Sequence, residues 1–101
     1  MEELTFYVAG VQHHNIKDCV EEMEKGDQLN LVAEPENCFD SSAVRIEYSG
    51  RERSTMIGYV PRKFSKTVAL ALLNRDISCT LIELDSDRVP WEMCRITVKE
   101  E

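Results

Sequence analysis

Two short segments of this chain join turn-forming residues to aromatic and charged side chains. They are residues 34–44 (EPENCFDSSAV) and residues 57–62 (IGYVPR). An aromatic ring offers a face on which a base can stack, a guanidinium can bind phosphate, and a fixed carboxylate can accept a hydrogen bond from a hydroxyl. The side chains of these kinds are Phe39, Asp40, Tyr59 and Arg62. Because loops and strand ends beside a rigid scaffold often present binding groups, the two segments predict a binding site.

The sequence supports a catalytic site less well than a binding site. His13 and His14 together with Asp40 suggest a metal hydrolase, but adjacent side chains of a strand point to opposite faces and would not share one ion. The sequence contains no His-x-x-x-His motif, no phosphate-binding loop and no serine or cysteine nucleophile motif. We therefore expect a binding protein that is not an enzyme and needs no cofactor or metal.

Cysteine spacing and hydropathy predict a cytoplasmic domain. The four cysteines are far apart and lack the Cys-x-x-Cys pair of zinc sites and redox dithiols, so we expect reduced thiols, several of them in the core. No apolar stretch is as long as a membrane span, and the chain begins with glutamates where a signal peptide would carry basic residues. Residues 1–101 are expected to form one domain.

Charge is distributed unevenly along the chain. The net charge of −7 argues against a protein that grips duplex DNA over a wide face, because that mode needs many Lys and Arg contacts. Residues 45–66 nevertheless carry six basic against two acidic residues, which predicts either a local anion-attracting patch or simply a solvated hairpin tip and helix start. Residues 1–44 carry ten acidic against two basic residues, so a protein-interaction adaptor that meets a basic partner is the alternative function.

Hydrophobic periodicity predicts six strands and two helices. Runs of strand-forming residues predict strands at residues 4–12, 27–33, 43–48, 55–60, 76–84 and 92–98. Apolar residues on one face predict a short helix over residues 16–23, capped by Asn15 and stopped by Gly26. A second amphipathic helix follows Pro61. This order predicts a mainly β (α+β) domain, a small curled sheet or barrel closed by two short helices.

The residues that form these elements also resemble a known family. The blocks that carry the resemblance are Phe6-x-Val8-Ala9-Gly10-x-x-x-His14, Gly26-Asp27-x-Leu29-x-Leu31, Glu34-Pro35-x-Asn37-x-Phe39-Asp40-x-x-Ala43-Val44 and Ile57-Gly58-Tyr59-Val60-Pro61-Arg62. Four ordered blocks at matching spacing, over nearly the whole chain, resemble the HIRAN domain. The resemblance implies a six-stranded, OB-like β-barrel with two helices, found fused to helicase-like and nuclease modules and also as free-standing small proteins.

The resemblance also implies a ligand. In fork-remodelling members of the family the domain binds single-stranded DNA and recognises its free 3′-hydroxyl end. By this resemblance the chain is expected to be a DNA-binding module in DNA repair or stalled-fork processing, with a helicase or nuclease as a partner protein. Neither the resemblance nor the composition implies a membrane partner.

At the end of the first predicted strand, the resemblance assigns Gln12, His13 and His14 to the DNA site. The DNA-binding members present an arginine and two aromatics at these positions, so both charge and stacking area are smaller here. Histidine can still stack on a base, and near its ordinary pKa of about 6.5 it can donate to phosphate once protonated. We therefore expect binding to strengthen below neutral pH.

Residues 34–44 and 57–62 supply the other site residues that the resemblance implies. Phe39 falls at an aromatic position, Asp40 at that of the carboxylate that accepts from the terminal hydroxyl, and Tyr59 and Arg62 at positions that contact base and phosphate. Arg62 and Lys63 also open the second predicted helix, where the helix dipole disfavours cations and an anionic ligand would offset that cost.

Each of three assignments has a structural alternative that the sequence leaves open. Phe39 could be a core residue that plugs a barrel end. Asp40 could cap its own turn by accepting backbone N–H bonds. Tyr59 could have a half-buried ring with only its hydroxyl exposed.

Overall fold

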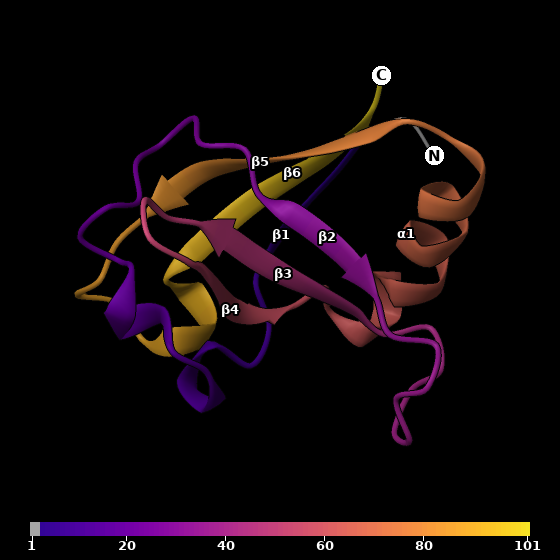
Figure 1. Ribbon diagram of the computed structural model, residues 1–101, viewed down its shortest axis with the longest axis horizontal. Helices are drawn as coiled ribbons and strands as arrows, with labels where there is room; N and C mark the ends of the chain where they lie inside the picture. Colours follow the sequence, from indigo (N-terminus) through magenta and orange to yellow (C-terminus); the bar gives the residue numbers. More distant parts are fainter. Residues whose placement is uncertain (1–2) are drawn as a thin grey trace.

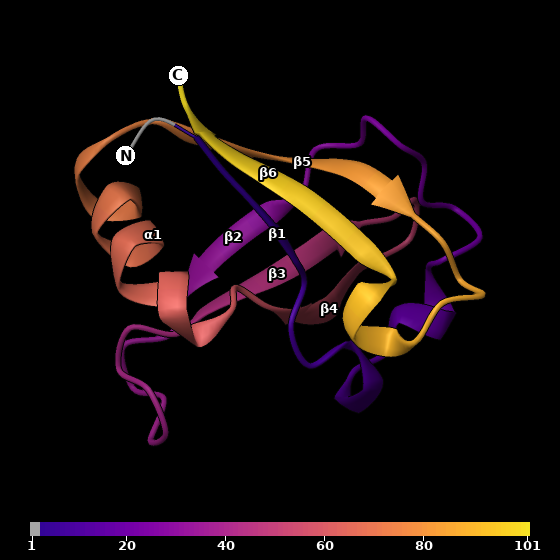
Figure 2. The same ribbon diagram turned by 180° about the vertical axis from the view of Figure 1, so that it is seen from behind.

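The computed structural model describes residues 3–101 and consists mainly of β-strands (Figures 1 and 2). The strands are β1 (Glu3–Tyr7), β2 (Asn30–Ala33), β3 (Val44–Ser49), β4 (Ser54–Tyr59), β5 (Ile77–Leu84) and β6 (Cys94–Glu100). One α-helix, α1 (Arg62–Asn74), lies between β4 and β5 in the described chain. The connection between β1 and β2 contains the short 3₁₀ turns η1 (Val11–His13) and η2 (Ile16–Asp18), and the connection between β5 and β6 contains η3 (Pro90–Glu92).

The strands form two antiparallel sheets of three strands each. One sheet has the order β1-β6-β5 and the other the order β2-β3-β4. Within residues 3–101 the isolated bridges outside the named strands pair Ala9 with Tyr59 and Gln28 with Thr80. In the described part of the chain the predicted six strands are present, whereas the predicted barrel is not found as a closed one.

The pairing between β4 and the chain after β1 stops at Pro61. Ala9 and Tyr59 exchange two backbone hydrogen bonds, each with 2.8 Å between nitrogen and oxygen. In an antiparallel ladder the next exchange of this kind would join Tyr7 to Pro61, and proline has no N–H to donate. Arg62 begins α1 directly afterwards, so the chain leaves the sheet instead of extending this side of a barrel.

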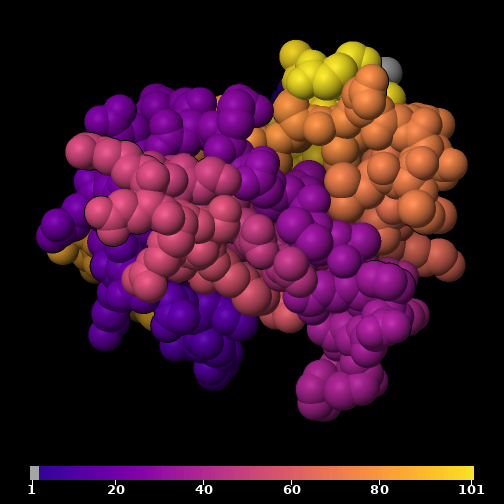
Figure 3. All heavy atoms as spheres, in the orientation of Figure 1, coloured from indigo at the N-terminus to yellow at the C-terminus, as the bar shows by residue number. Residues whose placement is uncertain are grey.

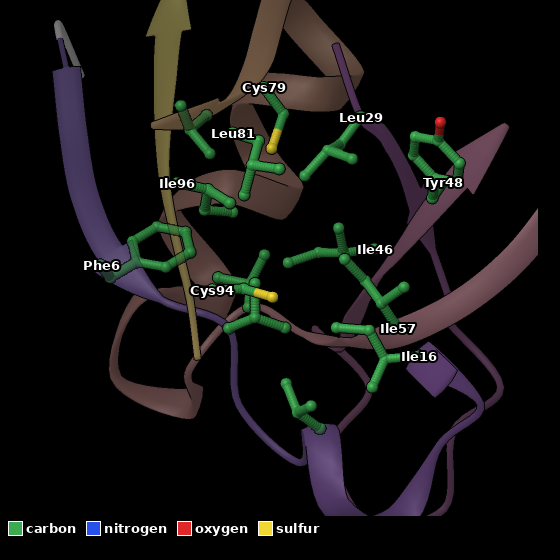
Figure 4. Close-up of a cluster of buried hydrophobic side chains, with 14 of the residues drawn as sticks. Phe6, Ile16, Leu29, Ile46, Tyr48, Ile57, Cys79, Leu81, Cys94 and Ile96 are labelled. Atoms are coloured by element: carbon green, nitrogen blue, oxygen red, sulfur yellow. The ribbon is translucent and has the colours of Figure 1, made fainter. Parts of the chain in front are cut away.

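The core lies between the two sheets (Figure 4). Ile46 and Ile57 from one sheet point toward Leu81 and Ile96 from the other, and all four side chains are fully buried. Alternate residues of β3 and β6 are buried, as the period of two in their sequence predicts. Because burying a side chain of this size contributes roughly 1.5–3 kcal/mol, the core strongly favours one register in each sheet.

Three cysteines belong to this core. Cys19, Cys79 and Cys94 are buried, and Cys38 is exposed. Burial raises the pKa of the Cys79 thiol to about 12. Burial is also the main cause that raises the pKa of the Cys94 thiol to about 12. The expectation that several thiols act as small core residues is confirmed.

The N-terminal part of the chain departs most from the predicted elements. The first strand ends at Tyr7 and not at residue 12, because Gly10 adopts a left-handed conformation with φ of 71° and leads into η1. The predicted helix over residues 16–23 is wrong: η2 is followed by turns, and Asn15 makes no side-chain cap hydrogen bond. Without a cap, so short a helix gains too little from its own hydrogen bonds to form. Its apolar stripe is still buried, through Ile16, Cys19 and Met23.

Helix α1 closes one end of the two sheets (Figures 1 and 2). Its Phe64 ring stacks on Phe6 of β1, with 5.3 Å between ring centroids, and Val68 is fully buried. These contacts hold the first turn of α1 beside the loop between β2 and β3. Within residues 3–101 no helix has the length and apolarity that a membrane crossing requires.

Candidate functional site

The loop between β2 and β3 projects from the body of the protein next to the start of α1 (Figures 1 and 3). A pocket of about 430 Å³ lies between this loop, the end of β4 and the first residue of α1. Its lining residues are Ala9, Asn37, Phe39, Asp40, Ala43, Tyr59, Val60 and Arg62. Phe39, Asp40, Tyr59 and Arg62 therefore line one pocket, although residues 45–56 separate the two sequence segments that carry them.

Asn37 shapes the tip of the loop. Its side-chain oxygen accepts hydrogen bonds from the backbone N–H groups of Phe39 and Asp40, at 2.9 and 3.1 Å. This Asx-type turn turns the Phe39 ring outward, where it is 83% exposed. The alternative in which Phe39 is a core residue is therefore wrong, and the ring is available as a stacking surface.

The Asp40 carboxylate is held at both oxygens. Oδ1 accepts from the backbone N–H of Ser42 at 2.9 Å, and Oδ2 accepts from Ser65 Oγ of α1 at 2.9 Å. The hydrogen bonds from Ser42 and Ser65 hold the pKa of Asp40 below its ordinary value, and the nearby Arg62 cation acts in the same direction. Asp40 does cap its own turn, as the structural alternative proposed. Each oxygen of the ionised carboxylate still has a lone pair for a further donor.

Arg62 ties the first turn of α1 to the loop. Its guanidinium donates to the backbone carbonyl of Phe39 at 2.6 Å, and the side chain is exposed. A guanidinium carries five N–H donors, so this bond leaves others free for an anion. Ser65, from the same helix turn, is almost fully buried beneath Asp40. The helix start thus supplies one cation and one support for the carboxylate.

Tyr59 forms the opposite wall and is bound to Glu34. Its hydroxyl donates to Glu34 Oε1 at 2.8 Å, and Asn37 Nδ2 donates to the same oxygen at 3.0 Å. The hydrogen bond to Glu34, with burial, raises the pKa of Tyr59. Burial alone would raise the pKa of Glu34, but hydrogen bonds from Asn37, Tyr59 and Arg45 outweigh it and keep that pKa below its ordinary value. The Tyr59 ring is half-buried, as the alternative anticipated, but its hydroxyl is hydrogen-bonded to Glu34.

Gly58 allows Tyr59 to reach this position. A Cβ at residue 58 would lie 2.4 Å from the backbone oxygen of Ala9 and 2.6 Å from Val8 Cγ1, closer than real side chains approach. Glycine is therefore required for the close contact that forms the bridge between Ala9 and Tyr59. This bridge brings the chain after β1 to the edge of the pocket.

The residues from the end of the first predicted strand do not line the pocket. Gln12 and His13 are exposed on η1, and His14 follows it. The His14 ring contacts Tyr59 edge-on, with 5.6 Å between centroids. Burial, assisted by the neighbouring His13, lowers the pKa of His14, while Glu34 opposes this shift.

Lys63 faces a neighbouring groove of about 390 Å³, which shares Ala9 with the pocket. Its ammonium lies over the Phe64 ring, 5.1 Å from the centroid, and exposed Trp91 from η3 lines the same groove. Lys63 is therefore separated from the four pocket residues but lies next to them.

Sequence reasoning missed three residues that organise the pocket: Glu34, Asn37 and Ser65. Asn37, in a turn after a proline, carries a local signal, because asparagine commonly bonds backbone N–H groups two or three residues ahead. Glu34 and Ser65 act on partners about 25 positions away, which no local pattern reveals. Across residues 3–101 no three His, Cys, Asp or Glu side chains gather as metal ligands would.

The assembled groups can bind a ligand that combines a ring, an anion and a hydroxyl donor. Phe39 and Tyr59 offer aromatic surface, Arg62 offers donors to an anion, and Asp40 offers a fixed acceptor. A nucleotide at the end of a strand has all three features.

Comparisons with known proteins identify the family. The family model described as the HIRAN domain matches residues 1–99. A protein named Fanconi-associated nuclease 1 homolog, from Oryza sativa subsp. japonica, is 34% identical over 86 residues, which cover 80% of this chain and 8% of that protein. The chain thus spans a small part of this relative.

Two solved structures have the same fold. The crystal structure of the HIRAN domain of human HLTF superposes with a TM-score of 0.72 at 12% identity, over 98% of this chain and 74% of that one. A protein from Lactobacillus plantarum superposes with a TM-score of 0.77 at 17% identity, over 99% of this chain and 91% of that one. The family model, which matches residues 1–99, shows that the chain belongs to the HIRAN domain family.

Proposed function

We propose that this domain binds single-stranded DNA by its free 3′-hydroxyl end, in the pocket between the β2–β3 loop and the start of α1. The observation that carries the proposal is the convergence of Phe39, Asp40, Tyr59 and Arg62 on one pocket. Family membership supports it, as does the relative that is named a nuclease homolog.

Each group has a defined task in this proposal. The terminal base packs against the exposed Phe39 ring and the half-exposed Tyr59 ring, and such stacking contributes roughly 1–3 kcal/mol per base. Arg62 donates to the phosphate that precedes the terminal sugar. Asp40 accepts from the 3′-hydroxyl through a lone pair that Ser42 and Ser65 leave free.

The charge of Asp40 gives the pocket its selectivity. Hydrogen bonds keep its pKa below the ordinary value, so the carboxylate is ionised at neutral pH and acts only as an acceptor. A strand that ends in a 3′-phosphate would place an anion against this carboxylate and would offer it no hydroxyl donor. The hydroxyl end is therefore preferred.

The neighbouring residues extend the proposed contact. His14 lies against Tyr59, and Gln12 and His13 precede it in the chain, on η1. In this proposal the three residues contact the sugar and phosphate of the bound strand. Lys63 lies in the adjoining groove and meets the next phosphate of the strand. The protein acts as a binding module that presents a DNA end to a helicase or nuclease partner in DNA repair or stalled-fork processing, with residues 1–101 as a single domain.

Fluorescence anisotropy with a labelled single strand of about ten nucleotides, at about 0.1 M salt, tests this proposal. The strand is compared in its 3′-hydroxyl and 3′-phosphate forms and with a blunt duplex. We expect the hydroxyl form to bind about tenfold more tightly than the phosphate form, and Asp40→Ala to abolish that difference. Arg62→Ala should weaken binding to both forms alike, because it removes a phosphate contact and leaves the hydroxyl contact in place.

Arg51→Ala provides the matched control, because it removes a cation from the exposed turn between β3 and β4, away from the pocket. Its binding should equal that of the unmodified protein. Equal and weak binding to all three DNA forms would contradict the proposal and favour a protein-interaction adaptor, to which the net charge of −7 is suited. Chelator-sensitive degradation of the strand would point to a nuclease instead.

A further inference from the structure

The Glu34 carboxylate receives hydrogen bonds from both walls of the pocket. Oε1 accepts from the Tyr59 hydroxyl at 2.8 Å and from Asn37 Nδ2 at 3.0 Å. Oε2 accepts from Arg45 of β3 at 3.3 Å, and Arg45 in turn bonds Glu47 at 2.6 Å. The Glu34 side chain is 20% exposed, so these bonds lie largely out of solvent.

Through Asn37, this carboxylate is connected to the tip of the loop. Asn37 donates to Glu34 with its side-chain nitrogen and accepts from the N–H groups of Phe39 and Asp40 with its oxygen. A continuous series of hydrogen bonds therefore runs from Tyr59 on β4 through Glu34 and Asn37 to Asp40. The side-chain amide of Asn37 is also oriented by this arrangement, because only its nitrogen can donate to Glu34.

We infer that Glu34 is a positioning residue that fixes the separation of Tyr59 and Asp40, and that it thereby sets the preference of the pocket for a hydroxyl end. This inference rests on the proposed function of the pocket. A terminal nucleotide held by its base at Tyr59 reaches Asp40 with its hydroxyl only if the two walls keep one separation, since hydrogen bonds weaken steeply with distance and angle. Glu34 contacts no ligand itself.

The role of Glu34 can be tested without DNA. Three variants are compared: Glu34→Ala removes all of its contacts, Glu34→Gln keeps Oε1 as an acceptor, and Glu36→Ala removes the same charge from an exposed neighbour in the same loop. Amide hydrogen exchange by NMR reports the N–H groups of Phe39 and Asp40. We expect about tenfold faster exchange of both amides in Glu34→Ala, and near-native rates in Glu34→Gln and Glu36→Ala.

The pKa of the Tyr59 phenol is a second measure of the role of Glu34. A structural defect elsewhere in the protein would not change this pKa. The hydrogen bond to Glu34 is the main cause of the raised pKa of Tyr59, so this pKa should fall in Glu34→Ala and stay unchanged in Glu36→Ala. Unchanged exchange and unchanged Tyr59 titration in Glu34→Ala would overturn the inference.

The binding arm measures the ratio of affinities for 3′-hydroxyl and 3′-phosphate strands. We expect Glu34→Ala to reduce this ratio about fivefold or more, and Glu34→Gln and Glu36→Ala to keep it within about twofold. If Glu34→Ala does not fold, Tyr59→Phe deletes one bond of the series while keeping the ring, and it should reduce the same ratio. If Glu34→Ala and Tyr59→Phe keep the affinity ratio of the unmodified protein, the inference is overturned. If the unmodified protein itself binds both strands equally, the proposed function is refuted. Amide exchange at Phe39 and Asp40 and the Tyr59 titration then decide the role of Glu34.

Discussion

At the scale of single residues, the pocket contains groups whose ionisation is set by their neighbours. Asp40 and Glu34 accept hydrogen bonds that keep their pKa values below the ordinary ones, so both are anionic at neutral pH. Positive charge at the pocket comes from Arg62. His14, against Tyr59, is neutral at neutral pH because burial, with a contribution from His13, lowers its pKa.

The affinity for a single strand should rise as pH falls from about 8 to about 6, and should continue to rise below that. A bound phosphate favours the protonated imidazole, so protons and DNA strengthen each other's binding. Since the pKa of His14 is lowered, its part of the rise comes below the ordinary pKa of 6.5. Anisotropy titrations across this range measure the effect, and His14→Phe should flatten its acidic part. If the affinity of the unmodified protein does not change with pH, the prediction is wrong.

At the scale of elements, the pocket depends on three connections between segments. The Asx-type turn at Asn37 orients the loop, the bridge between Ala9 and Tyr59 places the end of β4, and Ser65 joins α1 to Asp40. Pro61 ends the pairing of β4 and starts α1 in the same place. The pocket therefore lies where the two sheets stop pairing and the helix begins.

Gly58→Ala should destabilise the protein by about 3 kcal/mol and weaken DNA binding, because its Cβ would collide with the Ala9 carbonyl. The backbone cannot give way without breaking the bridge that places Tyr59. Urea unfolding followed by circular dichroism measures the free energy of unfolding. Ser54→Ala, at the exposed start of the same strand, serves as control and should cost much less. If Gly58→Ala has the same free energy of unfolding as the unmodified protein, the close approach of residue 58 to Ala9 does not require glycine and the prediction is wrong.

At the scale of the whole molecule, a net charge of −7 surrounds a pocket that carries one cation, with Lys63 close by. Such a protein gains little from long-range attraction to nucleic acid. Under the proposed function, binding instead comes from a few local contacts at one strand end.

The dependence of affinity on salt should therefore be weak. If Arg62 and Lys63 contact two phosphates, the slope of log K against log salt concentration should be about −1.4, since each contact on a single strand contributes roughly −0.7. Anisotropy at several salt concentrations measures this slope, and Lys63→Ala should halve it. A slope several times steeper would mean that a broad basic surface, and not this pocket, holds the DNA.

Much of this protein followed from its sequence. The six strands, the helix after Pro61 and the buried alternation of β3 and β6 are local consequences of hydrophobic periodicity and of proline geometry. The ordered blocks around Phe39 and Tyr59 indicated the family, which the family model shows. The chemical character of the four pocket residues was also readable, because it depends on residue type alone.

Tertiary structure alone decided the rest. The helix predicted over residues 16–23 does not form, because burial of Ile16 and Cys19 outweighs a weak, uncapped helical pattern. The six strands of residues 3–101 form two sheets and no closed barrel, because closure depends on pairing between segments distant in sequence. The bonds that Glu34 and Ser65 make to partners about 25 residues away arise only when the sheets and α1 pack together. Residue types thus determined what the pocket can bind, and long-range packing determined how those groups are held.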